Sequence, residues 1–172
     1  MAELAPAGQP RDFRLGFAGD TFNTAWYLAR IAPDIDVSYL TAVGDDSISQ
    51  DMRAFMRSSR ISDAYVQKID GKTVGLYLIH LKEGERSFSY WRDTAAARQL
   101  AMNKAVLDDA MQNADVIYYS GITLAILDPD SRVNLFDALQ RARSRGKTVA
   151  FDTYIRPTLW THPQEMKVTS RL

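Results

Sequence analysis

Hydrophobic positions follow a helical period in the first part of the chain. They predict a helix over residues 21–32, with Asp20 as its N-cap and Pro33 at its end. A second helix, over residues 47–59, is predicted by a Ser-x-x-Gln capping box that an apolar stripe follows. The apolar run between them, residues 36–43, predicts a buried strand.

The hydrophobic period changes from helical to two between residues 64 and 92. Residues 74–79 and 88–91 alternate as strands around a glycine-containing turn, which predicts a β-hairpin. Strands without helices of their own indicate a small sheet added to a main layer. Residues 1–15 show no clear period, so we expect a loop or a short strand remnant there.

Strands and helices alternate in the second half of the chain. Strands are predicted over residues 115–119 and 148–152, and a helix over residues 103–113. A further helix is expected to begin with Asp130 as its cap and to stop at Gly146. This alternation is typical of a parallel sheet covered by helices, so the sequence predicts an α/β fold.

Composition and charge narrow the classes of partner. The chain has 172 residues, enough for one domain or a large part of one. Its 21 basic and 21 acidic residues cancel, which gives no reason to expect nucleic acid or a membrane surface as partner. The sequence contains no cysteine, no long apolar run and no secretory leader, so we expect a cytoplasmic protein.

Candidate ligand-binding residues lie where predicted strands end and where the first helix begins. Polar segments follow strands at residues 44–46, 120–123 and 152–157, and ligands of open parallel sheets bind beyond such carboxyl ends. Residues 17–23 form a small-residue turn before a helix, where backbone N–H groups can meet ligand oxygens. We therefore expect a polar-ligand site here, with the hairpin folding over it as a lid.

The order of these segments resembles the ribokinase-like (PfkB) carbohydrate kinases, and within them the kinases of 2-keto-3-deoxygluconate. The motifs that carry the resemblance span residues 19–25, 41–46, 75–77, 84–92, 120–127 and 151–160. They occur in the family's order over residues 3–163. The resemblance implies a three-layer α/β/α sheet, here incomplete, with a small β-lid at about residues 64–92. It places the partial kinase domain at residues 1–163 and a tail outside the family pattern at residues 164–172.

The resemblance also implies an activity and a set of substrate contacts. The family transfers the γ-phosphoryl group of ATP, with Mg²⁺, to a sugar hydroxyl, and the acceptor expected here is a small sugar acid. The implied substrate contacts are Gly19, Asn23, Tyr77, Tyr90, Arg92, Ile122 and Arg156. Gly19 and Asn23 would contact hydroxyl groups, the two tyrosines would wall the site, and Ile122 would line its floor. Arg92 and Arg156 would bind the carboxylate, because a guanidinium offers it paired donors.

Each of these signals also has a structural interpretation. Glycine and asparagine are common at helix starts, and paired tyrosines can simply stabilise a hairpin. Lone arginines are mostly solvated. The neighbouring carboxylates of Asp45 and Asp46 resemble a paired-carboxylate site, but a strand-end turn and a helix cap explain them equally well.

Several residues depart from the family pattern. Ala18 replaces the first glycine of a Gly-Gly pair, and Tyr154 stands where the family has asparagine. The family's first strand is expected to be missing, and no Gly-x-Gly-Asp segment occurs. We therefore expect a truncated kinase that is inactive alone, with no catalytic, cofactor-binding or metal-binding residue. The alternative is a non-catalytic remnant or module that binds a sugar acid or associates with a second copy through the lid.

Overall fold

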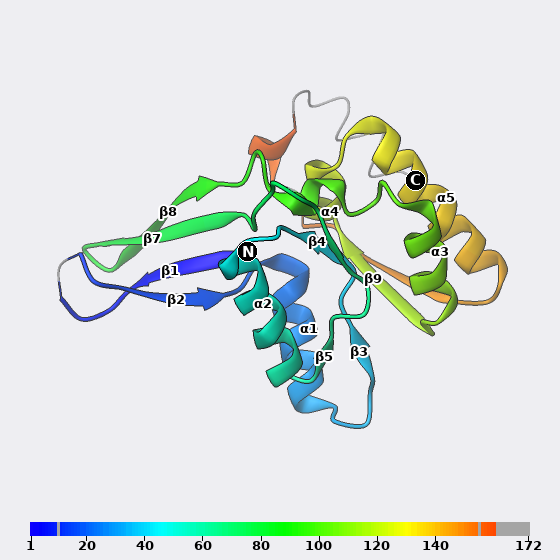
Figure 1. Ribbon diagram of the computed structural model, residues 1–172, viewed down its shortest axis with the longest axis horizontal. Helices are drawn as coiled ribbons and strands as arrows, with labels where there is room; N and C mark the ends of the chain where they lie inside the picture. The colour runs from blue at the N-terminus through cyan, green and yellow to red at the C-terminus, as the bar shows by residue number, and fades with distance from the viewer. Residues whose placement is uncertain (10, 155, 161–172) are drawn as a thin grey trace. The chain divides into compact units, whose positions relative to one another are not determined.

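A computed structural model describes residues 1–9, 11–154 and 156–160. The chain forms two compact units, residues 1–97 and residue 98 onward (Figure 1). The first unit contains β1 (Ala2–Pro6), β2 (Phe13–Phe17), α1 (Asp20–Ile31), β3 (Val37–Ser38), β4 (Thr41–Val43), α2 (Ser47–Ser58), β5 (Ile61–Ser62), β6 (Val66–Lys68), β7 (Leu76–Lys82) and β8 (Glu85–Trp91). The second contains α3 (Lys104–Gln112), β9 (Val116–Ser120), α4 (Gly121–Ile126), α5 (Pro129–Ser144), β10 (Thr148–Asp152) and the 3₁₀ helix η2 (Pro157–Leu159). A further 3₁₀ helix, η1 (Ala96–Gln99), lies at the boundary in sequence.

A four-stranded sheet in the order β2-β1-β7-β8 contains the predicted hairpin. Strands β7 and β8 pair antiparallel around Glu83 and Gly84, whose φ angles of 55° and 84° suit a type I′ turn. The hairpin is confirmed, and it is longer than predicted. Of the two alternatives for residues 1–15, a loop or a short strand remnant, the loop is wrong. Strands β1 and β2 form an antiparallel pair there, and β1 also pairs parallel with β7.

Short parallel strands form the rest of the first unit's sheet structure. Strand β3 pairs with β5, and β4 pairs with β6. The single strand expected over residues 36–43 is therefore split in two, with the Tyr39 N–H donating to the Ser62 carbonyl between them (3.0 Å). Residues 66–68 join this parallel system, so the four-stranded sheet does not coincide with the range 64–92 expected for the lid.

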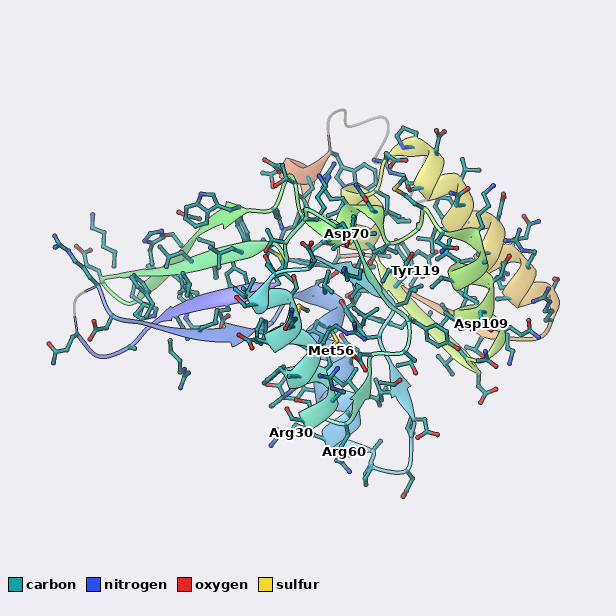
Figure 2. All side chains as sticks on the ribbon, in the orientation of Figure 1. Arg30, Met56, Arg60, Asp70, Asp109 and Tyr119 are labelled. Atoms are coloured by element: carbon teal, nitrogen blue, oxygen red, sulfur yellow. The ribbon has the colours of Figure 1, made fainter. Side chains whose placement is uncertain are left out.

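Helices α1 and α2 cover the core of the first unit. Phe22 of α1 and Met56 of α2 are 2% and 0% exposed, and Figure 2 marks Met56 in this core. The Phe55 ring lies 6.2 Å from Phe22 and 5.6 Å from Phe17 at the end of β2. Full burial of one such side chain stabilises a fold by roughly 1.5–3 kcal/mol. Through Phe17, Phe22 and Phe55, the four-stranded sheet therefore packs against helices α1 and α2.

The caps of two helices lie before the residues that the sequence predicted. The Asp46 carboxylate accepts from the Ser49 N–H (2.9 Å), so Asp46 caps α2 and Ser47 begins it. Asp128, not Asp130, caps α5 by accepting from the Ser131 N–H (2.7 Å). Both capping aspartates have the extended backbone that an N-cap needs.

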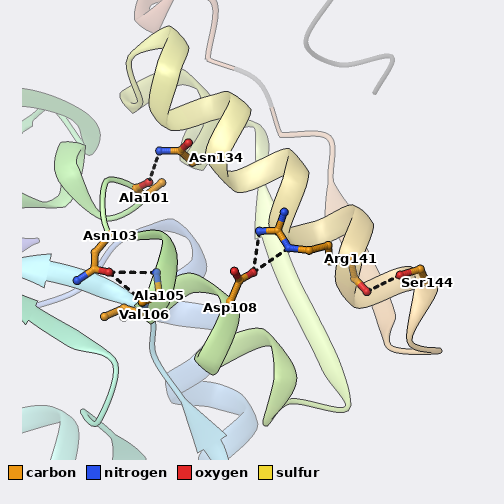
Figure 3. Close-up of polar contacts among 8 residues, drawn as sticks. All are labelled: Ala101, Asn103, Ala105, Val106, Asp108, Asn134, Arg141 and Ser144. Carbon is orange, nitrogen blue, oxygen red and sulfur yellow. Dashed lines mark hydrogen bonds and ion pairs between the residues drawn. The ribbon is translucent and has the colours of Figure 1, made fainter.

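The second unit places helices against a parallel pair of strands. Strand β10 pairs with β9, and α5 contacts β10. Helix α3 packs against α5, where Arg141 makes two hydrogen bonds to Asp108 (3.1 and 2.7 Å) and the Asn134 amide donates to the Ala101 carbonyl (Figure 3). Asn103 caps α3, as Figure 3 also shows. Within the described ranges, no helix combines the length and apolarity needed to cross a membrane.

Candidate functional site

The turn before α1 is closed by its own residues. Gly19 is the N-cap of α1 and has a φ of 132°, a conformation that favours glycine. Its backbone N–H donates to Oδ1 of Asn23 (3.0 Å), and the Asn23 N–H donates back to the Gly19 carbonyl (2.9 Å). Asp20 is the first helical residue and not the cap that the sequence predicted. The N–H group of Gly19, expected to face a ligand, is thus already hydrogen-bonded.

A half-buried tyrosine anchors the same end of α1. The hydroxyls of Thr21 and Tyr39 lie 2.9 Å apart, and the Tyr39 ring packs edge-on against Phe22 at 5.2 Å. Burial raises the pKa of Tyr39 to about 12, although the hydrogen bond with Thr21 opposes this and the charge of Asp20 adds to it. The Tyr39 hydroxyl therefore anchors Thr21, which lies in the same first turn of α1 as Asn23.

Four residues form a row across the four-stranded sheet, one from each strand. Gly16 pairs with Glu3, Glu3 with Tyr77, and Tyr77 with Tyr90. Residues opposite one another on neighbouring strands point to the same face, so we call these four residues the cross-strand row. The Tyr77 hydroxyl donates to Oε2 of Glu3, and the rings of Tyr77 and Tyr90 are 6.0 Å apart.

Arg92 lies beside the end of this row. Its guanidinium carbon is 4.2 Å from the centre of the Tyr90 ring, a cation–π distance. Gly75 makes room for it, because a Cβ at that position would lie 3.1 Å from the Arg92 Cβ. A guanidinium stacked on a ring keeps its N–H groups around its edge, where a carboxylate can meet two of them. The structure thus brings Tyr77, Tyr90 and Arg92 together on one face.

The second unit holds Ile122 and Arg156. Ile122 is half-buried in α4, a short helix that the sequence did not predict and that begins with a capping box between Ser120 and Thr123. Arg156 is half-buried, and its Nε donates to the Tyr154 hydroxyl (3.3 Å). Tyr154, which departs from the family pattern, therefore contacts one of the predicted ligand-binding arginines.

The neighbouring carboxylates of Asp45 and Asp46 have separate structural roles. Asp45 accepts from the Gly71 N–H (3.2 Å), whereas Asp46 caps α2. Burial opposes the ionisation of Asp46, but hydrogen bonds from Ser49 and Thr73 outweigh it and hold the pKa of Asp46 below its ordinary value. In the part of the chain that the structure describes, no three His, Asp or Glu side chains are grouped to hold a metal ion.

A family model described as pfkB family carbohydrate kinase matches residues 3–171. This chain belongs to the pfkB family of carbohydrate kinases. The family match continues past residue 163 into the predicted tail, residues 164–172, which lies outside the described residues.

Curated relatives of this pfkB chain include proteins named 2-dehydro-3-deoxygluconokinase and proteins named probable fructokinase. It is 41% identical over 172 residues to a 2-dehydro-3-deoxygluconokinase of Dickeya dadantii, covering 97% of this chain and 55% of the relative. It is 39% identical over 170 residues to the 2-dehydro-3-deoxygluconokinase of Escherichia coli K12, covering 96% and 54%. The chain thus spans about half the length of the curated relatives that it matches.

Solved structures confirm the ribokinase-like α/β fold. The chain superimposes on a 2-dehydro-3-deoxygluconokinase from Thermotoga maritima with a TM-score of 0.85 at 22% identity, covering 99% of this chain and 53% of that one. A PfkB protein from Polaromonas gives a TM-score of 0.83 at 25% identity, covering 98% and 57%.

Glu3 is the residue of this face that the sequence did not single out. The sequence predicts only a strand remnant there, whereas the structure places Glu3 in the cross-strand row with its side chain half-buried. The signal was present but short, since Glu3 is a polar residue between the apolar Ala2 and Leu4. Its partner Tyr77 lies 74 positions further along the chain, so local spacing could not join them.

Proposed function

We propose that this chain supplies the acceptor side of a sugar-acid kinase, which converts 2-keto-3-deoxygluconate to its 6-phosphate with ATP and Mg²⁺. The names of the Dickeya and Escherichia relatives support this substrate. The compound 2-keto-3-deoxygluconate is the same as the 2-dehydro-3-deoxygluconate of those names. The pfkB family supports a sugar as acceptor.

The observation that carries the proposal is the stacking of Arg92 on Tyr90 beside Tyr77. A stacked guanidinium holds a fixed fork for a carboxylate, and loses little rotational freedom when a ligand binds. The two aromatic rings offer apolar surface to the C–H groups of a sugar. A cationic fork beside aromatic walls favours a sugar acid over a neutral sugar.

The remaining predicted contacts complete the proposal. The side chain of Asn23, exposed in the first turn of α1, would contact sugar hydroxyls next to Gly19. In the second unit, Ile122 would contact the carbon chain of the ligand and Arg156 would contact its carboxylate. Each of these contacts is testable by itself.

We assign no nucleotide-binding residue to this chain. Its 172 residues contain no Gly-x-Gly-Asp segment, the anion-binding motif that the family resemblance leads us to expect. The proposed use of ATP and Mg²⁺ therefore concerns the whole kinase, and for this chain we propose acceptor binding alone.

A second candidate function is association of two copies through the four-stranded sheet. The face opposite the cross-strand row exposes Phe13, Leu15 and Trp91 at 44%, 45% and 57%. Exposed apolar side chains beside sheet edges favour pairing with another chain. Sedimentation equilibrium would show a dimer that Leu15→Glu dissociates; a monomer at all concentrations would contradict this candidate.

Chemical-shift mapping tests acceptor binding directly. On titration of the ¹⁵N-labelled chain with 2-keto-3-deoxygluconate, we expect amide shifts at the seven predicted contacts. These are Gly19, Asn23, Tyr77, Tyr90, Arg92, Ile122 and Arg156. Arg143 on α5 serves as an internal control, and fructose, a neutral sugar, as the ligand control. Absence of shifts with the sugar acid, or equal shifts with fructose, would contradict the proposal.

A further inference from the structure

Glu3 places a carboxylate in the middle of the proposed sugar-binding face. It accepts the hydrogen bond of the Tyr77 hydroxyl and pairs directly with Tyr77 in the sheet register. The motifs that imply the sugar contacts assign it no role. We propose that Glu3 is a positioning residue: it accepts the hydrogen bond of the Tyr77 hydroxyl, so that the Tyr77 oxygen faces a ligand as an acceptor for a ligand hydroxyl. This inference rests on the proposed function.

The number of available protons limits what the Tyr77 hydroxyl can offer a ligand. A tyrosine hydroxyl has one proton to donate, and an ionised carboxylate can only accept. While Tyr77 donates to Glu3, its oxygen can offer a ligand only its lone pairs. The keto and carboxylate oxygens of a sugar acid are acceptors as well, so they cannot bind there. A hydroxyl of the ligand can, because it donates.

The charges of Arg92 and Glu3 also favour a ligand hydroxyl, and not the ligand carboxylate, at Tyr77. Arg92 stacks on Tyr90 of β8, whereas Glu3 lies on β1, with β7 between the two strands. Two strand spacings separate them, about 10 Å. The carboxylate of a ligand is attracted to Arg92 and repelled by Glu3. We therefore expect the sugar acid to lie with its carboxylate at Arg92 and a hydroxyl at Tyr77.

Gly16 is the neighbour of Glu3 on the side away from Tyr77. It is the member of the cross-strand row on β2 and contributes no side chain there. A Cβ at Gly16 would already lie 3.9 Å from Oε1 of Glu3. A side chain in place of Gly16 would therefore contact the Glu3 carboxylate.

The test compares Glu3 variants in two backgrounds by calorimetric titration with 2-keto-3-deoxygluconate. Glu3→Leu removes the acceptor, and we expect about tenfold weaker binding, the usual effect of one hydrogen bond. Glu3→Gln keeps an acceptor oxygen and should restore most of the affinity. In a Tyr77→Phe background, Glu3→Leu should change nothing further, because its effect passes through the hydroxyl. Glu85→Gln, at the far end of β8, is the matched control.

A ligand-free measurement separates this inference from the proposed function. With ¹³Cζ-labelled tyrosine, the Tyr77 resonance, assigned from Tyr77→Phe, should shift in Glu3→Leu and stay in Glu85→Gln. A resonance that does not move overturns the inference whatever the chain binds. Equal affinities of wild type and Glu3→Leu also overturn it. If Glu3→Leu shifts the Tyr77 resonance but the wild-type chain binds no sugar acid, the proposed function is overturned, and with it the role of Glu3 toward a ligand.

Discussion

Oδ1 of Asn23 accepts the backbone N–H of Gly19 at 3.0 Å, so a predicted sugar contact also closes the first turn of α1. Asn23→Ala removes this acceptor from an N–H group that has no other partner within the helix. We expect the free energy of unfolding to fall by about 0.5–1 kcal/mol. Urea unfolding measures it, with Thr24→Ala, at the next exposed position, as control. Equal losses in both variants would contradict a capping role for Asn23.

Gly44 allows two backbone segments to touch. A Cβ at this position would lie 1.7 Å from the Lys72 carbonyl oxygen, a distance that no side-chain adjustment relieves. We expect Gly44→Ala to lower the free energy of unfolding by about 3 kcal/mol or more, since the backbone itself must move. Gly16→Ala is the control, because its Cβ meets nothing nearer than 3.9 Å. Thermal unfolding of Gly44→Ala at the wild-type temperature would refute the close approach.

Asp63 makes stability depend on acid pH. Burial would raise the pKa of Asp63, but hydrogen bonds and charges from Arg53 (2.8 Å) and Arg57 (2.7 Å) outweigh it and hold the pKa below its ordinary value. A carboxyl with a lowered folded-state pKa stabilises the fold above its unfolded pKa of about 3.9. That contribution is lost as the pH falls through the folded-state pKa.

The measurement for Asp63 is urea unfolding of wild type and Asp63→Asn at pH 7 and at pH 3. We expect the variant to be about 1 kcal/mol less stable at pH 7. The difference should shrink at pH 3. Asp70→Asn, which removes the partner of the exposed Lys68, should change little at either pH. A difference that stays constant between the two pH values would show that Asp63 acts without its charge.

Local signals predicted the elements whose contacts are local. The strand over residues 148–152 is β10 as predicted, and Asn103 and Asn113 flank α3 as the helical period indicated. The register of β7 with β8 follows from the turn at Glu83 and Gly84, which places Tyr77 opposite Tyr90. These features depend on neighbours in sequence, so a pattern could find them.

The missed features depend on distant partners. Strands β1 and β2 are short and become stable only within a sheet of four strands, which the chain completes with β7 and β8. The contact between Glu3 and Tyr77 follows from that sheet order and not from any spacing. Tyr154 departs from the family pattern in sequence, but its contact with Arg156 is visible only in the structure.

Phosphoryl transfer by this chain alone is expected to be negligible. The acceptor contacts proposed here position a sugar acid but supply no group for the γ-phosphate. A coupled assay should therefore show no loss of ATP above a blank without protein when 2-keto-3-deoxygluconate and Mg²⁺ are present. Turnover that requires the sugar acid and scales with protein concentration would show that the donor site is present in these 172 residues.

Arg92, held on the Tyr90 ring, is proposed to bind the carboxylate of a sugar acid. Calorimetric titration of 2-keto-3-deoxygluconate into wild type, Arg92→Ala and Arg86→Ala measures this interaction. Arg86 is the control, because it lies exposed on β8, the strand that Arg92 follows in sequence. We predict saturable heat for wild type and Arg86→Ala, and at least about tenfold weaker binding for Arg92→Ala, since a hydrogen bond to a charged group is lost. Equal affinity of wild type and Arg92→Ala would contradict the account.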